Sequence, residues 1–362
     1  MPRTAIWGSG FVAGIHAEAL RSCKVDVAAV VSRSPDQSRA FAQRWAIPRW
    51  GSDESLLFEG EIDCVHICTP PGLHYEMARA LLEHGKHVIC EKPLCLADSE
   101  AMELAALARE RGLVCAVNFN ARYHDACLRA RQLCREGALG RMLLIHGSYL
   151  QQFGALPARA DWRYDPSLAG SMHAVTEIGS HWLDLAQHVS GQRVAAVSAN
   201  FGCFYPERWV ENGMMHARQA EGRQPMQVSG EDAAVISLRF ESGAMGAVTL
   251  SELSHGRHNH LSLELCGERG SLWWNSESGS LLHTASAGGD TTTQVFAFGS
   301  GFTDTFRRLM AEVYADVAAG RPSQQPSYPT FESGRDSVLL LNAVYESATN
   351  RSAWISVQRG EL

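Results

Sequence analysis

The sequence lacks the features that mark membrane, nucleic-acid-binding and disulfide-rich proteins. No apolar run reaches the roughly 18 residues that would cross a bilayer. The net charge is −7, from 32 basic and 39 acidic residues, and no block of Lys or Arg stands out, so nucleic acid and anionic membranes are poor partners. Ten cysteines show no paired C-x-x-C spacing in a chain of 362 residues, which favours reduced thiols. We therefore expect a cytoplasmic protein.

Other absences narrow the class further. The first residues do not form the apolar core of a signal peptide, because Gly8, Gly10 and Gly14 interrupt them. Repeats and low-complexity tracts are missing. Several histidines, such as His255 and His258, lack neighbours at ligand spacing, so we predict no metal. The length favours two domains.

A glycine-rich turn follows the first predicted strand. Residues 4–7 are predicted to form a short buried strand and run into G-x-G-x-x-A, after which residues 15–22 have the pattern of an amphipathic helix. In this strand–turn–helix context the glycines let a pyrophosphate approach the backbone at the helix N-terminus. The residues that we expect to contact the cofactor here are Gly8, Ser9, Gly10, Phe11 and Val12.

The end of the second predicted strand, residues 25–31, bears on the choice of cofactor. An NAD-preferring fold usually places a carboxylate there, on the ribose 2′-hydroxyl. This chain has Ser32 and Arg33, and a hydroxyl with a guanidinium suits a 2′-phosphate better. We therefore expect NADP or NAD, with a preference for NADP; the alternative for Arg33 is a solvated charge that stacks on adenine.

Two more predicted strands end in conspicuous turns. Residues 61–68 lead into Thr69, Pro70 and, at a helix start, His74; residues 86–89 lead into Glu91 and Lys92, followed by Pro93. Ligands of open α/β folds bind at these carboxyl ends. The alternation of strands and helices predicts a doubly wound parallel Rossmann sheet over residues 1–120.

The second half, residues 121–362, has a different pattern. Its long strands, among them 233–240 and 244–251, alternate apolar and polar residues and predict an α+β domain with a large, mostly antiparallel open sheet. One face of such a sheet favours burial against another copy, so we expect a homo-oligomer. Residues 205–230 and 284–294 are polar and are predicted to be loops.

A known family shares several of these motifs. Gly8-Ser9-Gly10, Thr69-Pro70, Glu91-Lys92-Pro93, Asn120-Ala121-Arg122-Tyr123, Asp161-Trp162-Arg163 and the segment 178–184 resemble the glucose–fructose oxidoreductase / inositol dehydrogenase / rhizopine catabolism protein family. The resemblance covers nearly the whole chain. It implies a pyridine-nucleotide oxidoreductase of sugars, polyols and related carbonyl compounds, and dimers or tetramers formed through the second-domain sheet.

A helix predicted over residues 176–189 would carry the catalytic partners of Lys92. Glu177 and His181 fall on one face of it, with Asp184. We expect Lys92 to hydrogen-bond the reacting oxygen, His181 to exchange its proton, and Glu177 to orient His181 or hold a hydroxyl. The family normally has Asp where this chain has Glu177, which moves the charge by more than about 1 Å and can change the substrate.

Other residues are expected to line the site. Glu91 would position the nicotinamide, and Asn120 and Arg122 would border the ribose or the substrate, unless Arg122 ties the domains together. The substrate-binding residues that we expect are Lys92, Arg122, Trp162, Arg163, Glu177 and His181, with Asp161 and Asp184 as further candidates for binding sugar hydroxyls. His173 either lines the pocket or lies at the surface.

Two other functions fit the same fold. One is a reductase or dehydrogenase of a non-sugar substrate, of the dihydrodiol or imine type. The other is a non-catalytic regulator that binds dinucleotide and signals to a partner. Retention of both Lys92 and His181 argues against the regulator, because a sensor needs neither.

Overall fold

The structure is a computed structural model that describes residues 2–297 and 301–359. These residues form two compact units. The first unit comprises the chain as far as Tyr123 together with residues 301–338, and the second comprises residues 124–297 and 339–359.

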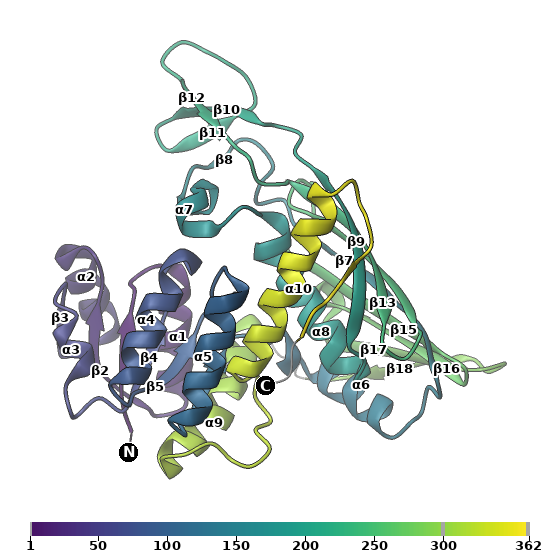
Figure 1. The fold of residues 1–362 in the computed structure, drawn as a ribbon, viewed down its shortest axis with the longest axis horizontal. Helices are drawn as coiled ribbons and strands as arrows, with labels where there is room; N and C mark the ends of the chain where they lie inside the picture. Colours follow the sequence, from purple (N-terminus) through teal and green to yellow (C-terminus); the bar gives the residue numbers. More distant parts are fainter. Residues whose placement is uncertain (1, 298–300, 360–362) are drawn as a thin grey trace. The chain divides into compact units, whose positions relative to one another are not determined.

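The first unit contains a six-stranded sheet in the order β3-β2-β1-β4-β5-β6 (Figure 1). Every neighbouring pair is parallel. The strands are β1 (Arg3–Trp7), β2 (Asp26–Val31), β3 (Arg49–Gly51), β4 (Cys64–Ile67), β5 (His87–Cys90) and β6 (Cys115–Val117). The strand order reverses between β1 and β4, which is where such folds bind ligands. The predicted doubly wound Rossmann sheet is therefore confirmed.

Helices cover both faces of this sheet, because neighbouring residues of a strand point to opposite faces. Ile6 of β1 lies in one apolar cluster, with side chains of α1, α2 and α9. Ala5 and Trp7 lie in the other, with side chains of α3, α4, α5 and the start of α10. The helices are α1 (Phe11–Ser22), α2 (Pro35–Trp45), α3 (Ser55–Phe58), α4 (His74–Glu83), α5 (Asp98–Glu110), α9 (Phe302–Ala319) and α10 (Phe331–Thr349).

Helix α9 differs from the sequence-based division of the chain. We assigned all of residues 121–362 to the second domain, but residues 301–338 pack with the first unit. The reason is the apolar stripe of α9, in which Phe306, Leu309, Met310 and Val313 are at most 2% exposed and join the cluster of α1. A helix buries its apolar stripe wherever a complementary face exists, regardless of distance along the chain.

The second unit contains a nine-stranded sheet in the order β18-β17-β16-β15-β7-β14-β13-β9-β19. All its pairs are antiparallel except β14 with β7. Burial alternates along β13, where Val235, Ser237 and Arg239 are exposed and their neighbours are buried. The predicted large, mostly antiparallel sheet with one open face is therefore confirmed. The long strands are β7 (Met142–Leu150), β9 (Val194–Gly202), β13 (Ala233–Phe240), β14 (Met245–Ser251), β15 (His260–Gly267) and β16 (Gly270–Asn275).

Helices α6 (Asp125–Arg135) and α8 (Ser180–Ser190) belong to this unit, as does the short α7 (Pro166–Ala169). Gly179, just before α8, allows a close approach to the sheet, since a Cβ there would lie 2.6 Å from a methyl carbon of Leu250 on β14. The indole of Trp182 is fully buried and donates to the carbonyl of Ser262 on β15 at 2.8 Å. These contacts place the start of α8 directly on the sheet.

Two segments predicted to be loops contain strands. Residues 205–230 hold β10 (Glu207–Glu211), β11 (Met214–His216) and β12 (Gln224–Gln227), which form a four-stranded sheet with β8 (Ala158–Arg159). Residues 284–294 fall largely in β17 (Leu281–Ser286) and β18 (Thr291–Val295), and β19 (Ile355–Ser356) adds the other edge of the large sheet. Asn212 and Gly213 join β10 to β11 with φ of 50° and 75°, and an Asn-Gly pair with positive φ is a strong hairpin signal that our prediction overlooked.

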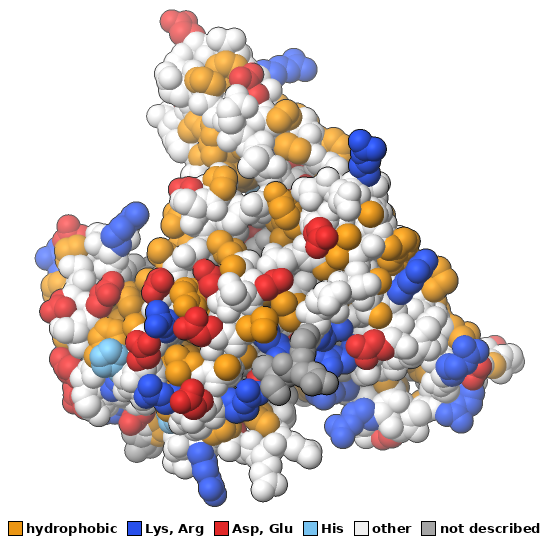
Figure 2. All heavy atoms as spheres, in the orientation of Figure 1, with side chains coloured by type: hydrophobic (Ala, Val, Ile, Leu, Met, Phe, Trp, Pro, Cys, Tyr) orange, Lys and Arg blue, Asp and Glu red, His pale blue; other side chains and the backbone are white. Residues whose placement is uncertain are grey.

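The distribution of charged side chains on the surface agrees with the sequence, in which no block of Lys or Arg stands out. Figure 2 shows acidic and basic side chains interspersed over the face that it presents. Within the described ranges, no helix combines the length and the apolar character that crossing a membrane requires.

Candidate functional site

The glycine turn after β1 fits a dinucleotide. Gly8 has a φ of +125°, and a Cβ there would lie 2.5 Å from the carbonyl oxygen of Cys68, so only glycine is accommodated. A Cβ on Gly10 would meet nothing within 4 Å. Helix α1 begins after Gly10 without a side-chain cap and without an acidic residue in its first turn, which leaves amide groups and the positive end of the helix dipole for an anion. Phe11, which is 82% exposed, and Val12 stand at the same helix end.

The turn after β2 is arranged differently from our expectation for a 2′-phosphate. The hydroxyl of Ser32 lies 2.7 Å from the Ser38 hydroxyl and donates to the carbonyl of Ser34 at 3.1 Å. Arg33 is exposed. Because the turn itself occupies the serine hydroxyl, Arg33 is the side chain of this pair that remains to meet a phosphate.

His74 connects the two turns at the carboxyl edge of the sheet. It is fully buried, with one ring nitrogen 2.8 Å from the carbonyl oxygen of Pro93 and the other 2.8 Å from that of Thr69. Burial lowers the pKa of His74, although both contacts oppose the shift. Pro70, next to Thr69, precedes the short helix Pro71–Leu73. His74 therefore lies between the Thr69 turn and the turn that contains Lys92, and its neutral ring donates to one of the two carbonyls.

Glu91 points into the protein. It is 7% exposed, and its Oε1 atom lies 2.9 Å from His16 Nε2 and accepts from Asn118 Nδ2 at 2.5 Å. Its Oε2 atom accepts from the backbone N–H of Lys92 at 3.2 Å. Burial alone would raise the pKa of Glu91, but its bonds with His16 and Asn118 outweigh it and hold the pKa below its ordinary value. Lys92 itself is half-buried and precedes a cis peptide bond to Pro93.

The segment after β6 is tied to α9. Asn120 is 3% exposed, and its amide donates to the hydroxyl of Thr305 on α9 at 2.7 Å. The guanidinium of Arg122 lies over the ring of Phe119, 5.9 Å from its centroid. α9 therefore contributes to the placement of a residue that we expected beside the cofactor.

The helix that carries Glu177 and His181 begins irregularly. We predicted one regular helix over residues 176–189, whereas residues Val175–Gly179 form a π-helical turn before α8. The wider turn changes the spacing of the face that we expected Glu177 to share with His181. Such π turns occur frequently at functional sites.

Glu177 joins a charged group with the 161–163 segment. Its Oε2 atom accepts from Arg163 Nε at 3.0 Å, while Arg163 Nη1 donates to Asp161 Oδ2 at 2.7 Å. The Arg163 guanidinium also lies 4.8 Å from the ring centroid of Trp162. Burial would lower the pKa of Arg163, but Glu177 and Asp161 outweigh it and raise the pKa. The structure thus brings together three of the predicted substrate residues, Trp162, Arg163 and Glu177.

Glu231 supports the start of the π turn, and the sequence analysis missed it. Its carboxylate accepts from the backbone N–H groups of His173, at 3.1 Å, and Val175, at 2.7 Å. Burial raises the pKa of Glu231 to about 7. His173, which we expected in the pocket or at the surface, is 4% exposed and stacks on Tyr164 at 4.5 Å. His173 is therefore not a surface histidine; it lines a small pocket together with Arg163 and Tyr164.

His181 lies in the first turn of α8 and is half-buried. The ring of Tyr149 on β7 is 6.5 Å away between centroids. The Tyr149 hydroxyl donates to Asn259 Oδ1 at 2.7 Å, and burial raises the pKa of Tyr149. Asp184, one turn later, is 7% exposed, so it faces the interior of the unit.

One group of metal-ligand side chains occurs in the described part of the chain. His146, Glu264 and Cys266 lie close together on the large sheet, half-buried. His146 and Glu264 are a cross-strand pair of β7 and β15, with Nε2 and Oε2 at 3.8 Å. The Cys266 thiol contacts the same carboxylate at 3.9 Å. Cross-strand pairing accounts for the His146–Glu264 contact, and Cys266 lies on the same face of β15 as Glu264 because it is two residues further along that strand.

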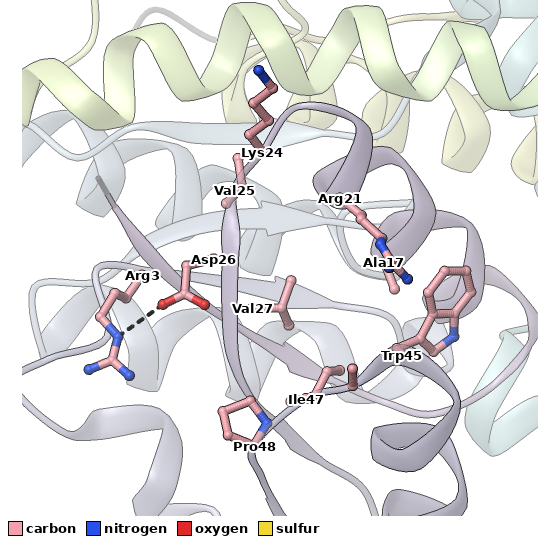
Figure 3. Close-up of a pocket in the computed structure, with 11 residues that line it drawn as sticks. Arg3, Ala17, Arg21, Lys24, Val25, Asp26, Val27, Trp45, Ile47 and Pro48 are labelled. Atoms are coloured by element: carbon pink, nitrogen blue, oxygen red, sulfur yellow. Dashed lines mark hydrogen bonds and ion pairs between the residues drawn. The ribbon is translucent and has the colours of Figure 1, made fainter.

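A pocket of about 580 Å³ opens at the amino edge of the parallel sheet, opposite the glycine turn (Figure 3). Arg3 and Asp26, at the starts of β1 and β2, form an ion pair of 3.3 Å at this pocket. Arg21, Lys24 and Trp45 also line it. Ligands of doubly wound sheets bind at the carboxyl edge, so this pocket is not the cofactor site.

Comparison with known proteins agrees with this geometry. Residues 2–119 match the family described as "Oxidoreductase family, NAD-binding Rossmann fold", and residues 127–273 match "GFO/IDH/MocA C-terminal domain". The chain is 31% identical to levoglucosan dehydrogenase of Pseudarthrobacter phenanthrenivorans over 354 residues, covering 91% of this chain and 88% of that protein. It is 27% identical to scyllo-inositol 2-dehydrogenase (NAD(+)) of Bacillus subtilis over 274 residues, covering 75% and 73%.

A solved structure matches over nearly the full length. Levoglucosan dehydrogenase in complex with NADH and L-sorbose superposes with a TM-score of 0.89 at 27% identity, covering 99% of each chain. Both halves of the chain, the glycine turn and these relatives lead to one assignment. The chain belongs to the GFO/IDH/MocA family and is a nicotinamide-dependent oxidoreductase.

Proposed function

We propose that the protein transfers a hydride between NAD(H) and a sugar or polyol, with Lys92 and His181 acting on the reacting oxygen. The named relatives act on levoglucosan and scyllo-inositol, which makes a cyclic polyhydroxy compound the first substrate to test. The observation that carries the proposal is the turn of Lys92, which both Glu91 and His74 hold at the carboxyl edge of the Rossmann sheet.

The lysine content supports the role of Lys92. The chain has three lysines, Lys24, Lys86 and Lys92. Lys86 has a structural role, since its Nζ atom donates to the carbonyls of Glu59 and Ile62 at 2.6 Å each. Lys24 follows α1, beyond its C-cap Cys23, and lines the pocket at the amino edge. Lys92 is therefore the lysine placed where a ligand of this fold binds.

Each residue has a distinct task in the proposed reaction. Bound nicotinamide supplies the hydride chemistry. Lys92 donates a hydrogen bond to the alcohol oxygen and stabilises the negative charge that develops there. His181 removes the proton from that oxygen, and returns it in the reverse direction, because the ordinary pKa of imidazole lies near neutrality. Glu177 and Arg163 bind the other hydroxyls of the substrate.

The cofactor proposal departs from our sequence-based preference for NADP. The family description and the NADH complex of a relative support NAD(H), and the NADP preference has no support from them. In addition, the hydroxyl of Ser32 is bonded within its turn. We expect kcat/KM to be at least about tenfold higher with NAD⁺ than with NADP⁺; a higher value with NADP⁺ would restore a phosphate-binding role for Arg33.

The main experiment follows nicotinamide absorbance with levoglucosan, scyllo-inositol and other polyols. Lys92→Met should lower kcat by on the order of 10³-fold, because it removes a charge-stabilising donor, while NADH still binds. Lys24→Met is the matched control and should keep wild-type rates. Near-normal turnover of Lys92→Met would refute the proposed role of Lys92. A turnover confined to apolar alcohols or imines would instead favour the non-sugar alternative.

Two further proposals concern the association of copies of the chain and the location of the protein. We propose that copies of the chain associate through the open face of the nine-stranded sheet, where Val235 and Met245 are 54% and 65% exposed. Met245→Glu should shift the mass in light scattering toward the monomer, while Arg193→Glu, outside the strands of that face, should not.

We also propose a reducing, cytoplasmic location, in line with ten free cysteines.

A further inference from the structure

A chain of buried polar side chains runs beneath the carboxyl edge of the Rossmann sheet. The Tyr314 hydroxyl is 2.9 Å from His66 Nε2, and His66 Nδ1 is 2.7 Å from His16 Nδ1. His16 Nε2 is in turn 2.9 Å from Glu91 Oε1. Both histidines are fully buried, and Tyr314 and Glu91 are 7% exposed. Three of the four residues come from α9, β4 and α1, and Glu91 directly follows β5.

The chemistry of these groups determines where the protons lie. The lowered pKa of Glu91 keeps its carboxylate ionised, so Oε1 accepts and His16 Nε2 donates. Burial, with His16 beside it, holds the pKa of His66 well below its ordinary value, so His66 is neutral. When His16 is also neutral, its Nδ1 must accept from His66 Nδ1–H. His66 Nε2 then accepts from the Tyr314 hydroxyl, and every bond points toward Glu91.

The hydrogen-bonded series Tyr314–His66–His16–Glu91 also connects two parts of the proposed site, the phosphate cradle and the Lys92 turn. His16 lies on α1, whose N-terminus forms the phosphate cradle with Gly10. Glu91 accepts from the backbone N–H of Lys92 through Oε2. A carboxylate buried to this extent is costly unless it is hydrogen-bonded, and its bonds with His16 and Asn118 hold its orientation. A shift of α1 on dinucleotide binding would therefore be felt at the backbone of Lys92.

We propose that His16 and Glu91 are a pair of positioning residues that couple the dinucleotide-binding helix to the Lys92 turn, with His66 and Tyr314 setting the protonation pattern of the pair. The proposal rests on the proposed function, because it assumes that Lys92 contacts the reacting oxygen. No proton needs to move along the four hydrogen-bonded side chains for this coupling to work. Its effect is to keep the Lys92 amino group in a productive position, where a displacement of about 1 Å can cost on the order of 100-fold in rate.

The first test does not depend on activity. In protein labelled with ¹⁵N-histidine at pH 9, well above the ordinary pKa of about 6.5, His66 should carry its proton on Nδ1 and have a bare Nε2. The ring-nitrogen signals of His66 are identified as the ones that disappear in the His66→Gln variant. A proton on Nε2 of His66 would overturn the arrangement, because the Tyr314 hydroxyl would then have to accept instead of donate.

The second test separates positioning from packing. Glu91→Gln should lower kcat by on the order of 100-fold, and His16→Gln by about tenfold, with KM for NADH within about threefold of wild type. Tyr314→Phe, at the far end of the chain, should lower kcat less than His16→Gln does. His87→Gln is the matched control: His87 is a buried histidine at the amino end of β5, and its Nδ1 atom accepts from the N–H of Val114 at 2.9 Å.

These variants distinguish the possible outcomes. If His87→Gln loses stability but keeps kcat, while Glu91→Gln and His16→Gln lose kcat beyond any loss of stability, the pair positions Lys92. If kcat follows the unfolding midpoint in all four variants, or stays near wild type in Glu91→Gln, the coupling is refuted. If no sugar or polyol is turned over by the wild type, the proposed function fails, and a His66 proton on Nδ1 would still confirm the arrangement of the chain.

Discussion

Glu231 provides the sharpest prediction for stability. Its carboxylate accepts the N–H groups of His173 and Val175 at the start of the π turn, and burial raises its pKa from 4.5 to about 7. In the unfolded chain the carboxylate ionises near pH 4.5, whereas in the folded chain it stays protonated to about pH 7. The folded state therefore binds more protons between these values, and stability must fall as the pH rises through this window.

The magnitude follows from the size of the shift. At about 1.4 kcal/mol per pKa unit, it corresponds to about 3 kcal/mol of stability that is fully present below pH 4.5 and lost above about pH 7. The variant Glu231→Gln keeps the size and one acceptor oxygen but cannot ionise. Relative to this variant, the wild type should lose about 2–3 kcal/mol between pH 5 and pH 8.

The assay is urea unfolding of both proteins at half-unit steps of pH, followed by tryptophan fluorescence. Glu207→Gln, which changes an exposed carboxylate in the same unit, serves as the control and should follow the wild-type profile. Parallel profiles of the wild type and Glu231→Gln would refute the reasoning. So would a wild type that gains stability over Glu231→Gln as the pH rises.

Three further predictions concern other positions. Asp232→Asn should cost about 3–5 kcal/mol in urea unfolding, because it removes the charged partner, 2.5 Å away, of the fully buried Arg208; a cost below 1 kcal/mol would contradict this role. Gly8→Ala should abolish NADH binding in a fluorescence titration, since the new Cβ would lie 2.5 Å from a backbone oxygen at a φ of +125°. Arg163→Met should raise KM for the sugar about tenfold with little change in the affinity for NADH, because it releases Glu177; an unchanged KM would remove the pair from the substrate site.

Local patterns predicted the Rossmann unit well. The apolar run before Gly8 became β1, and the amphipathic pattern after Gly10 became α1, which begins at Phe11 rather than at Ile15. Such elements are predictable because a strand followed by a glycine turn and an amphipathic helix depends on neighbouring residues alone. The alternation of apolar and polar residues along β13 was equally clear in the sequence, and the alternating burial in the structure confirms it.

The environment of the candidate residues was less predictable. Nothing near His74 in the sequence shows that both its ring nitrogens contact backbone carbonyls. The π turn at Glu177 also escaped prediction, because its start is capped by Glu231, 54 positions later in the chain. Tertiary contacts of this kind decide whether a side chain faces a ligand or the interior.

The order of residues by itself determined the glycine cradle, the strand ends that carry Thr69 and Lys92, and the two-part architecture, because each follows from spacing along a short segment. Tertiary structure alone decided that α9 joins the first unit and that His16, His66 and Tyr314 converge on Glu91. The physical reason is that buried polar groups must find partners inside the fold. Those partners are chosen by proximity in space, which a pattern along the chain does not record.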